Sequence, residues 1–208
     1  MKIGVLGTGN MGSGLARQFA AAGHDVFIGS RDSQKGKELG AELGTGGGSY
    51  QEAADHGEAV LFAVPWWGVD ESLEAAGTLS GKVLIDCTNA YTDETYTEML
   101  EFPGSSGAEE IAKKAQGARV VKAWNHTYAA IVNSTPDFGD VSASVFICGD
   151  DPSAKEMVMR LAADAGYDPV DSGPLASARF VERVAGLMVT LAYGVGMGTD
   201  QALKLVRR

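Results

Sequence analysis

The part of this sequence best suited to chemistry is a glycine-rich turn close to the N-terminus. Gly7, Gly9 and Gly12 follow the apolar run KIGVL with the spacing G-x-G-x-x-G and precede a helical pattern. In such a turn the first glycine permits a tight bend, the second lets a pyrophosphate approach the backbone, and the third lets the helix pack on the strand. The free N–H groups at the helix N-terminus favour a phosphate. The position of these glycines between a strand and a helix therefore predicts a dinucleotide site.

The residues after the second predicted strand indicate which dinucleotide would bind. A site for NAD usually has Asp or Glu here, about 20 residues beyond the glycines, to bind the ribose 2′-hydroxyl. The sequence GSRDSQK instead offers a hydroxyl, a guanidinium and an ammonium group at Ser30, Arg31 and Lys35. These groups suit a 2′-phosphate, which a carboxylate would repel. Asp32 is the competing signal, but it could cap the following helix instead, so NADP(H) is the favoured cofactor.

Three further segments should lie at the same edge of the sheet, because each of them follows a predicted strand. They are VPWW (64–67), CTNAYT (87–92) and KAWNHTYAA (122–130). The tryptophans of the first segment could face a bound ring or simply cap the core. The residues of these segments that we expect to contact the cofactor or its reaction partner are Val64, Pro65, Trp66, Asn89 and Asn125.

His126 is the histidine nearest to this edge and therefore the one candidate for a proton donor. An ordinary hydrogen-bonded or exposed histidine is the alternative. The sequence has no Ser/His/Asp set and no Tyr-x-x-x-Lys pair in a suitable place. No spacing of Cys and His resembles a metal site, so we expect no bound metal. If the protein is a redox enzyme, it needs no acid or base side chain of its own.

Strand-like and helical segments alternate along most of the chain. Alternation with strands that are apolar on both sides predicts an α/β fold of the Rossmann type, with a doubly wound, mainly parallel sheet. We assign residues 1–173 to an NADP-binding domain on this plan. The glycine-rich run GTGGGS (44–49) is expected to be a loop, and residues 89–107 a long irregular connection.

Residues 174–208 are expected to form a small, mostly helical segment that is too short to have a core of its own. It must therefore pack on the sheet domain or on a second subunit. Within it, LMVTLAYGVGMG (187–198) is apolar on most faces. This pattern favours burial at a homodimer contact.

Charge and hydropathy exclude two classes of partner. The net charge of −10 argues against a nucleic acid, because phosphate binding needs clustered Lys and Arg. The apolar runs are too short to span a membrane, and the start of the chain lacks the pattern of a signal peptide. A cytoplasmic protein that acts on a small-molecule redox substrate is expected.

Several stretches resemble the coenzyme F420:NADP oxidoreductases, a family with a Rossmann domain and a small helical C-terminal part. They are GTGNMGSGLARQFAAAGHDVFIGSRD, VPWW, CGDDPSAKEMVMRLAADAGYDPVDSGPL and the helix that begins ASARFVE. The pattern SR-x-x-x-K and the segment DSGPL are the most specific parts. The resemblance implies that Ser30, Arg31 and Lys35 hold the 2′-phosphate, with further contacts from Thr8 and from the backbone of Asn10 and Met11.

The resemblance also implies coenzyme F420 as the second substrate. Its deazaflavin ring would stack on the nicotinamide near Pro65, Trp66, Asn125 and Ala130. A hydride would then pass directly between the rings, while the protein supplies contact distance and orientation. The stretch WNHTYAAIV lacks a proline that archaeal members have, so a flavin such as FMN or FAD stays an alternative acceptor. Two other functions stay open, namely an NADP-dependent imine or carbonyl reductase, which usually has a longer helical domain, and a non-catalytic NADP(H)-binding sensor.

Overall fold

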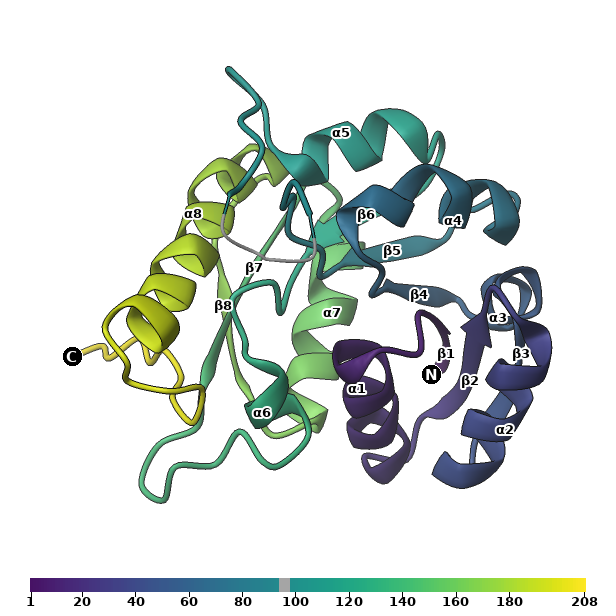
Figure 1. The fold of residues 1–208 in the computed structure, drawn as a ribbon, viewed down its shortest axis with the longest axis horizontal. Helices are drawn as coiled ribbons and strands as arrows, with labels where there is room; N and C mark the ends of the chain where they lie inside the picture. Colours follow the sequence, from purple (N-terminus) through teal and green to yellow (C-terminus); the bar gives the residue numbers. More distant parts are fainter. Residues whose placement is uncertain (94–97) are drawn as a thin grey trace.

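One sheet runs through the whole molecule in a computed structural model that describes residues 1–93 and 98–208. Within those residues it has eight strands in the order β3-β2-β1-β4-β5-β6-β7-β8, with β3 at one edge and β8 at the other (Figure 1). Strand β7 is antiparallel to β6, and every other neighbouring pair is parallel. The first six strands have the order of a dinucleotide-binding sheet, which confirms the predicted α/β Rossmann-type fold.

Strands and helices alternate along most of the chain, as the sequence pattern predicts. The strands are β1 (Lys2–Leu6), β2 (Asp25–Ser30), β3 (Gly46–Ser49), β4 (Ala59–Phe62), β5 (Val83–Asp86), β6 (Arg119–Lys122), β7 (Ser144–Gly149) and β8 (Asp168–Asp171). The helices are α1 (Asn10–Ala21), α2 (Ser33–Leu43), α3 (Tyr50–His56), α4 (Val69–Ala76), α5 (Gly107–Lys114), α6 (Ala129–Val132), α7 (Pro152–Asp164) and α8 (Ala178–Val189). The short turns are η1 (Trp66–Gly68), η2 (Leu175–Ser177) and the π-helical η3 (Thr190–Gly194).

Both faces of the sheet are buried, because successive strand residues pack on opposite sides. Ile3, Val5 and Leu61 belong to a core under α1, α6 and α7. Leu6 and Phe62 belong to a second core under α3, α4, α5 and α8. The carboxyl ends of β1, β4, β5 and β6 therefore meet at one edge between two rigid helical layers.

The expectation of a loop at residues 44–49 is wrong, because Gly46–Ser49 form the edge strand β3. This strand pairs in parallel with β2, from Phe27 opposite Gly46 to Ser30 opposite Ser49. Glycine is uncommon in strands, so no propensity signal marks this segment. Helix packing explains why glycine stands here: a Cβ atom at Gly47 would lie 2.2 Å from the carbonyl oxygen of Gly36 on α2, and one at Gly36 would lie 2.0 Å from that of Gly48.

The C-terminal segment is helical only in part. Helix α8 and η3 end at Gly194, and residues 195–208 contain no helix. Instead, the carbonyl of Leu203 accepts a hydrogen bond from the N–H of Ser144 at 2.7 Å. Lys204 forms an ion pair with Asp168 at 2.7 Å. The tail therefore packs along β7 and β8, while the division of the chain at residue 173 stays a prediction.

Candidate active site

The glycine turn leaves open space at the N-terminus of α1. Gly7 has a φ of +124°, a conformation that favours glycine. A Cβ atom at Gly12 would lie 2.0 Å from the carbonyl oxygen of Gly7, so α1 starts directly against the end of β1. Gly9 forms the N-cap without a side-chain hydrogen bond, and nothing lies within 4 Å of a Cβ atom built there. The turn therefore has the room and the exposed N–H groups that a pyrophosphate needs.

The predicted 2′-phosphate residues lie at the end of β2 and the start of α2. Ser30 is buried, whereas the side chain of Arg31 is 73% exposed. One guanidinium nitrogen of Arg31 lies 3.9 Å from a carboxylate oxygen of Glu71 on α4. Asp32 is the N-cap of α2, and its carboxylate accepts a hydrogen bond from the N–H of Gln34 at 3.0 Å. The competing signal for NAD is thus explained by helix capping.

A cavity of about 780 Å³ extends from the glycine turn to α8 and η3. It has the size of a typical small-molecule site. None of the described residues that line it has a charged side chain. The predicted site residues that line the cavity are Gly9, Asn10, Met11, Val64, Pro65, Trp66, Asn89, Asn125 and His126. Those that do not line it are Gly7, Thr8, Gly12, Ser30, Arg31, Lys35 and the exposed Ala130.

The far wall of the cavity comes from the C-terminal segment, which we expected to pack on the sheet domain or at a dimer contact but did not assign to the site. Its residues on α8 and η3 are Ala185, Met188, Val189, Thr190, Tyr193 and Gly194. The sequence signal that marks them is the pair of glycines, Gly186 and Gly194, which interrupt an otherwise apolar helix. The helix ends there in a π-helical turn, a feature that is frequent at functional sites.

His126 does not fit the role of proton donor that the sequence suggested. Its side chain is buried, and Nε2 accepts a hydrogen bond from the N–H of Phe146 at 3.1 Å. Burial lowers the pKa of His126 to about 4. At neutral pH the imidazole is therefore uncharged and holds no acidic proton to donate.

A buried ion cluster lies beside the cavity and was not found from the sequence. Lys122 at the end of β6 is fully buried, with Nζ at 2.9 Å from Asp86 and at 3.1 Å from Glu182 of α8. Burial alone would lower the pKa of Lys122, but the two carboxylates together raise it above its ordinary value. The Glu182 carboxylate also accepts hydrogen bonds of 2.9 Å from the N–H groups of Gly107 and Ala108 at the start of α5. The cluster therefore ties α8 to the sheet one turn before Ala185 of the cavity wall.

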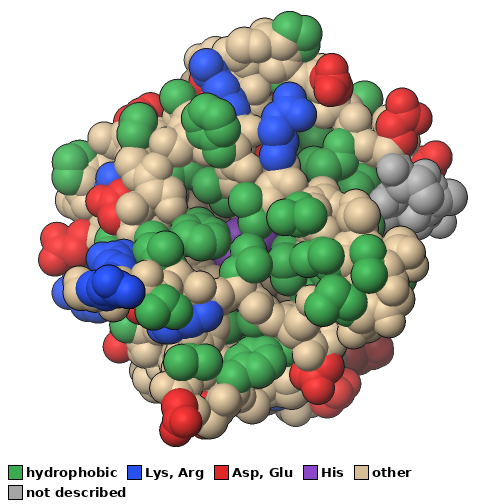
Figure 2. Space-filling model, turned by 90° about the vertical axis from the view of Figure 1, so that its left-hand side faces the viewer, with side chains coloured by type: hydrophobic (Ala, Val, Ile, Leu, Met, Phe, Trp, Pro, Cys, Tyr) green, Lys and Arg blue, Asp and Glu red, His purple; other side chains and the backbone are tan. Residues whose placement is uncertain are grey.

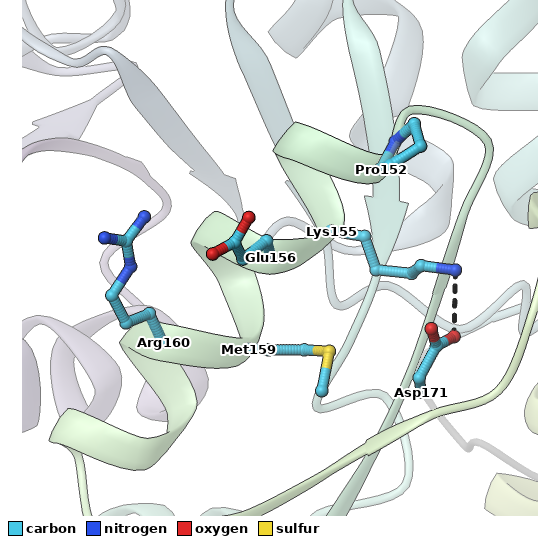
Figure 3. Close-up of a pocket in the computed structure, with 6 residues that line it drawn as sticks. All are labelled: Pro152, Lys155, Glu156, Met159, Arg160 and Asp171. Carbon is cyan, nitrogen blue, oxygen red and sulfur yellow. Dashed lines mark ion pairs between the residues drawn. The ribbon is translucent and has the colours of Figure 1, made fainter.

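A second hollow, of about 470 Å³, lies over α7 and β8 (Figure 3). Lys155 extends toward Asp171 and pairs with it at 2.9 Å. The other lining residues are Pro152, Glu156, Met159 and Arg160, and none of them lines the larger cavity. This hollow does not include the glycine turn, so we place the candidate site in the larger cavity.

Comparisons with known proteins show which family the chain belongs to. Residues 2–90 match the family model of coenzyme F420-dependent NADP oxidoreductases. The chain is 32% identical over 209 residues to the F420-dependent NADP reductase of Methanothermobacter marburgensis, and the match covers 92% of each chain. The chain belongs to this family. It is an NADP-dependent oxidoreductase by this membership.

Other relatives of this NADP-dependent oxidoreductase differ in length and in similarity. The chain is 34% identical over 184 residues to metalloreductase STEAP3 of Rattus norvegicus. The aligned region covers 88% of this chain but only 36% of STEAP3. A solved structure from Arthrobacter sp. FB24, described as a candidate F420-dependent NADP reductase, superposes with a TM-score of 0.87 at 29% identity and full coverage of both chains. An imine reductase from Pseudomonas sp. has a TM-score of 0.68 at 17% identity over 93% of this chain and 62% of that chain, which shows a shared fold alone.

The oxidoreductase has no helix, in residues 1–93 and 98–208, that is both long and apolar enough to cross a membrane.

The two cysteines of the oxidoreductase, Cys87 and Cys148, are free and buried. Burial raises the pKa of each thiol to about 12, so both stay protonated at neutral pH.

The buried cluster predicts a large loss of stability in the variant Lys122→Met. Removal of the ammonium group leaves two buried carboxylates without their cation, and we expect the free energy of unfolding to fall by about 3–5 kcal/mol. The loss should be smaller at about pH 5 than at pH 8, because protonation then relieves the unpaired carboxylates. Urea unfolding at both pH values measures it.

Lys155→Met is the matched control, since Lys155 pairs with Asp171 at 2.9 Å near the surface. We expect a loss of at most about 1 kcal/mol there. Equal losses in the two variants would show that the buried cluster has no special role.

Proposed function

We propose that this oxidoreductase transfers a hydride directly between NADP(H) and a deazaflavin or flavin ring that bind side by side in the cavity. The observation that carries the proposal is the composition of the cavity. It joins the glycine turn to an apolar wall on α8 and η3, and its described lining has no charged side chain. Direct transfer between two rings needs close contact and exclusion of water, and it needs no acid or base from the protein.

The dinucleotide would be held at two places. The turn of Gly7, Gly9 and Gly12, with Thr8 and the backbone of Asn10 and Met11, would hold the pyrophosphate. Ser30, Arg31 and Lys35 would hold the 2′-phosphate. When bound, the nicotinamide supplies the site of hydride exchange, and the segment Val64–Trp66 with Asn89 would position it.

The acceptor would bind between this segment and α8. Coenzyme F420 is the first candidate, because the relatives that match nearly the whole chain are named F420-dependent NADP reductases. FMN and FAD are the alternatives, because their flavin rings can also exchange a hydride with a nicotinamide ring. The imine reductases share only the fold with this chain.

Absorbance assays with NADPH and a panel of F420, FMN, FAD, riboflavin and a cyclic imine test the proposal. We expect transfer to F420 or to a flavin and none to the imine. The single-turnover rate should be nearly constant between about pH 7 and pH 9, because hydride transfer between the two rings requires no proton transfer from the protein. Tight binding of NADPH without transfer to any acceptor would instead favour a non-catalytic sensor.

The site for the 2′-phosphate predicts opposite effects for two charge changes. Arg31→Ala should weaken NADPH binding about 10- to 100-fold, because a charge-assisted hydrogen bond is lost. Glu71→Gln should tighten NADPH binding about 2- to 5-fold, because Glu71 repels the phosphate and competes for Arg31 across 3.9 Å. Calorimetric titration measures both Kd values.

NADH and the variant Glu74→Gln are the controls for these changes. NADH lacks the 2′-phosphate, so its Kd should change little in either variant. Glu74 is an exposed acid on the same helix and should have no effect when neutralised. If Glu71→Gln leaves the Kd of NADPH unchanged, the phosphate does not lie beside α4.

We also propose that the chain forms a homodimer through α8 and the segment that follows it. Phe180, Leu187, Val195 and Met197 are 74%, 54%, 64% and 61% exposed. Figure 2 shows hydrophobic side chains gathered on this side of the molecule. Exposed apolar patches of this kind usually mark contacts between proteins. The cytoplasmic location stays a prediction.

Light scattering should give twice the chain mass of 21.6 kDa. Leu187→Glu should shift it toward a single chain, because a carboxylate in an apolar contact is unfavourable. A single-chain mass for the unchanged protein at micromolar concentration would contradict the proposal.

A further inference from the structure

Two buried polar atoms of residues that line the cavity, Oγ1 of Thr88 and Oδ1 of Asn125, have no hydrogen-bond partner among the residues that the structure describes. We infer that these two side chains recognise an amide edge. Such an edge is a carbonyl next to an N–H, and Thr88 and Asn125 would bind it on one of the two rings. The inference rests on the proposed function and adds two residues that determine specificity and position the ring.

The first observation is the orientation of the Asn125 carboxamide. Asn125 is 4% exposed, and its Nδ2 donates at 3.2 Å both to Oδ1 of Asn89 and to the carbonyl of Val181. A backbone carbonyl only accepts hydrogen bonds, so the nitrogen must be the atom that faces Val181. Oδ1 of Asn125 is then a buried acceptor that has no donor within the described parts of the chain.

The backbone before Asn125 is held in a strained conformation. Trp124 has a φ of +58°, which is unusual for a large side chain. Its indole is fully buried and packs edge-on against Phe19 at 5.6 Å and Tyr167 at 6.0 Å. This packing holds the turn that brings Asn125 to the cavity.

The second observation is the side chain of Thr88. Its N–H donates to Oδ1 of Asp86 at 2.8 Å, and its carbonyl accepts from Nζ of Lys122 at 2.7 Å. Both backbone groups are therefore used by the buried ion cluster. The hydroxyl is the remaining polar group, and it is buried with no hydrogen-bond partner among the residues that the structure describes.

The two unpartnered groups lie at neighbouring strand ends of the same cavity. Asp86 of β5 is the register partner of Lys122 of β6. Thr88 lies two residues beyond Asp86, Asn125 lies three residues beyond Lys122, and both residues line the cavity. Buried polar groups of native proteins are nearly always hydrogen-bonded, which points to a ligand here.

The chemistry of the pair selects the ligand class. Oδ1 of Asn125 needs an N–H, and the Thr88 hydroxyl can donate to a carbonyl. An anionic group would be repelled by the acceptor, so a phosphate or carboxylate does not fit. The carboxamide of nicotinamide has the required edge, and so does the pyrimidine ring of a deazaflavin or flavin, in which N3–H lies between two carbonyls.

Calorimetric binding to ligands that lack the N–H tests the inference without a change in the protein. One arm compares NADP⁺ with its 3-acetylpyridine analogue, which keeps the carbonyl and replaces the amino group by methyl. The other arm compares FMN or F420 with its N3-methyl derivative. We expect about tenfold weaker binding in one arm and little change in the other, which identifies the ring that is read.

Thr88→Val tests the hydroxyl with nearly the same shape, and Thr88→Ser keeps it as the matched control. Thr88→Val should weaken the same ligand about tenfold, and Thr88→Ser should restore most of that loss. Equal binding of every ligand pair to the unchanged protein, with no effect of Thr88→Val, would overturn the inference. Binding is measured apart from turnover, so the two proposals can fail separately. If the ligand pairs bind equally but hydride transfer occurs, only this inference is overturned. If the protein distinguishes the ligand pairs but transfers no hydride, only the proposed function is contradicted.

Discussion

The site depends on one buried charge, the ammonium group of Lys122 between Asp86 and Glu182. An ion removed from water is strongly unfavourable unless every partner is in place, so these three side chains must be buried together. The ammonium group contacts two strands and α8, and Glu182 in turn binds the first N–H groups of α5. The floor and the far wall of the cavity are therefore positioned by a single interaction.

A second constraint is the close approach of backbones at glycine positions. Gly7 and Gly12 let α1 begin against the end of β1, and Gly36 lets α2 lie on β3. In both places the missing side chain is what permits the contact. At the turn of Gly7 and Gly12, the missing side chains also leave the N-terminus of α1 open to a phosphate. Helix packing and phosphate binding there therefore have the same cause.

These two constraints divide the cavity into regions of different chemistry. The glycine turn is polar and lies next to the exposed cations of β2 and α2, whereas the part enclosed by α8 and η3 is apolar. Charged groups of a dinucleotide would thus stay near the surface, and its reactive ring would enter a region with little water. His126 contributes to this region as a neutral, buried ring that supports β7 through Phe146.

The sequence by itself determined the α/β fold and the position of the glycine turn, because each of these depends on residues close together in the chain. It left the role of Asp32 open, and the structure shows that Asp32 caps α2. It did not predict β3, since a strand of glycines is stable only through its contact with α2. It also did not reveal the cluster of Lys122, the cavity wall on α8 or the low pKa of His126. Those features were decided by the tertiary structure, because burial and charge pairing join residues that are 20 to 74 positions apart. Local sequence patterns do not show which distant groups will bury a side chain.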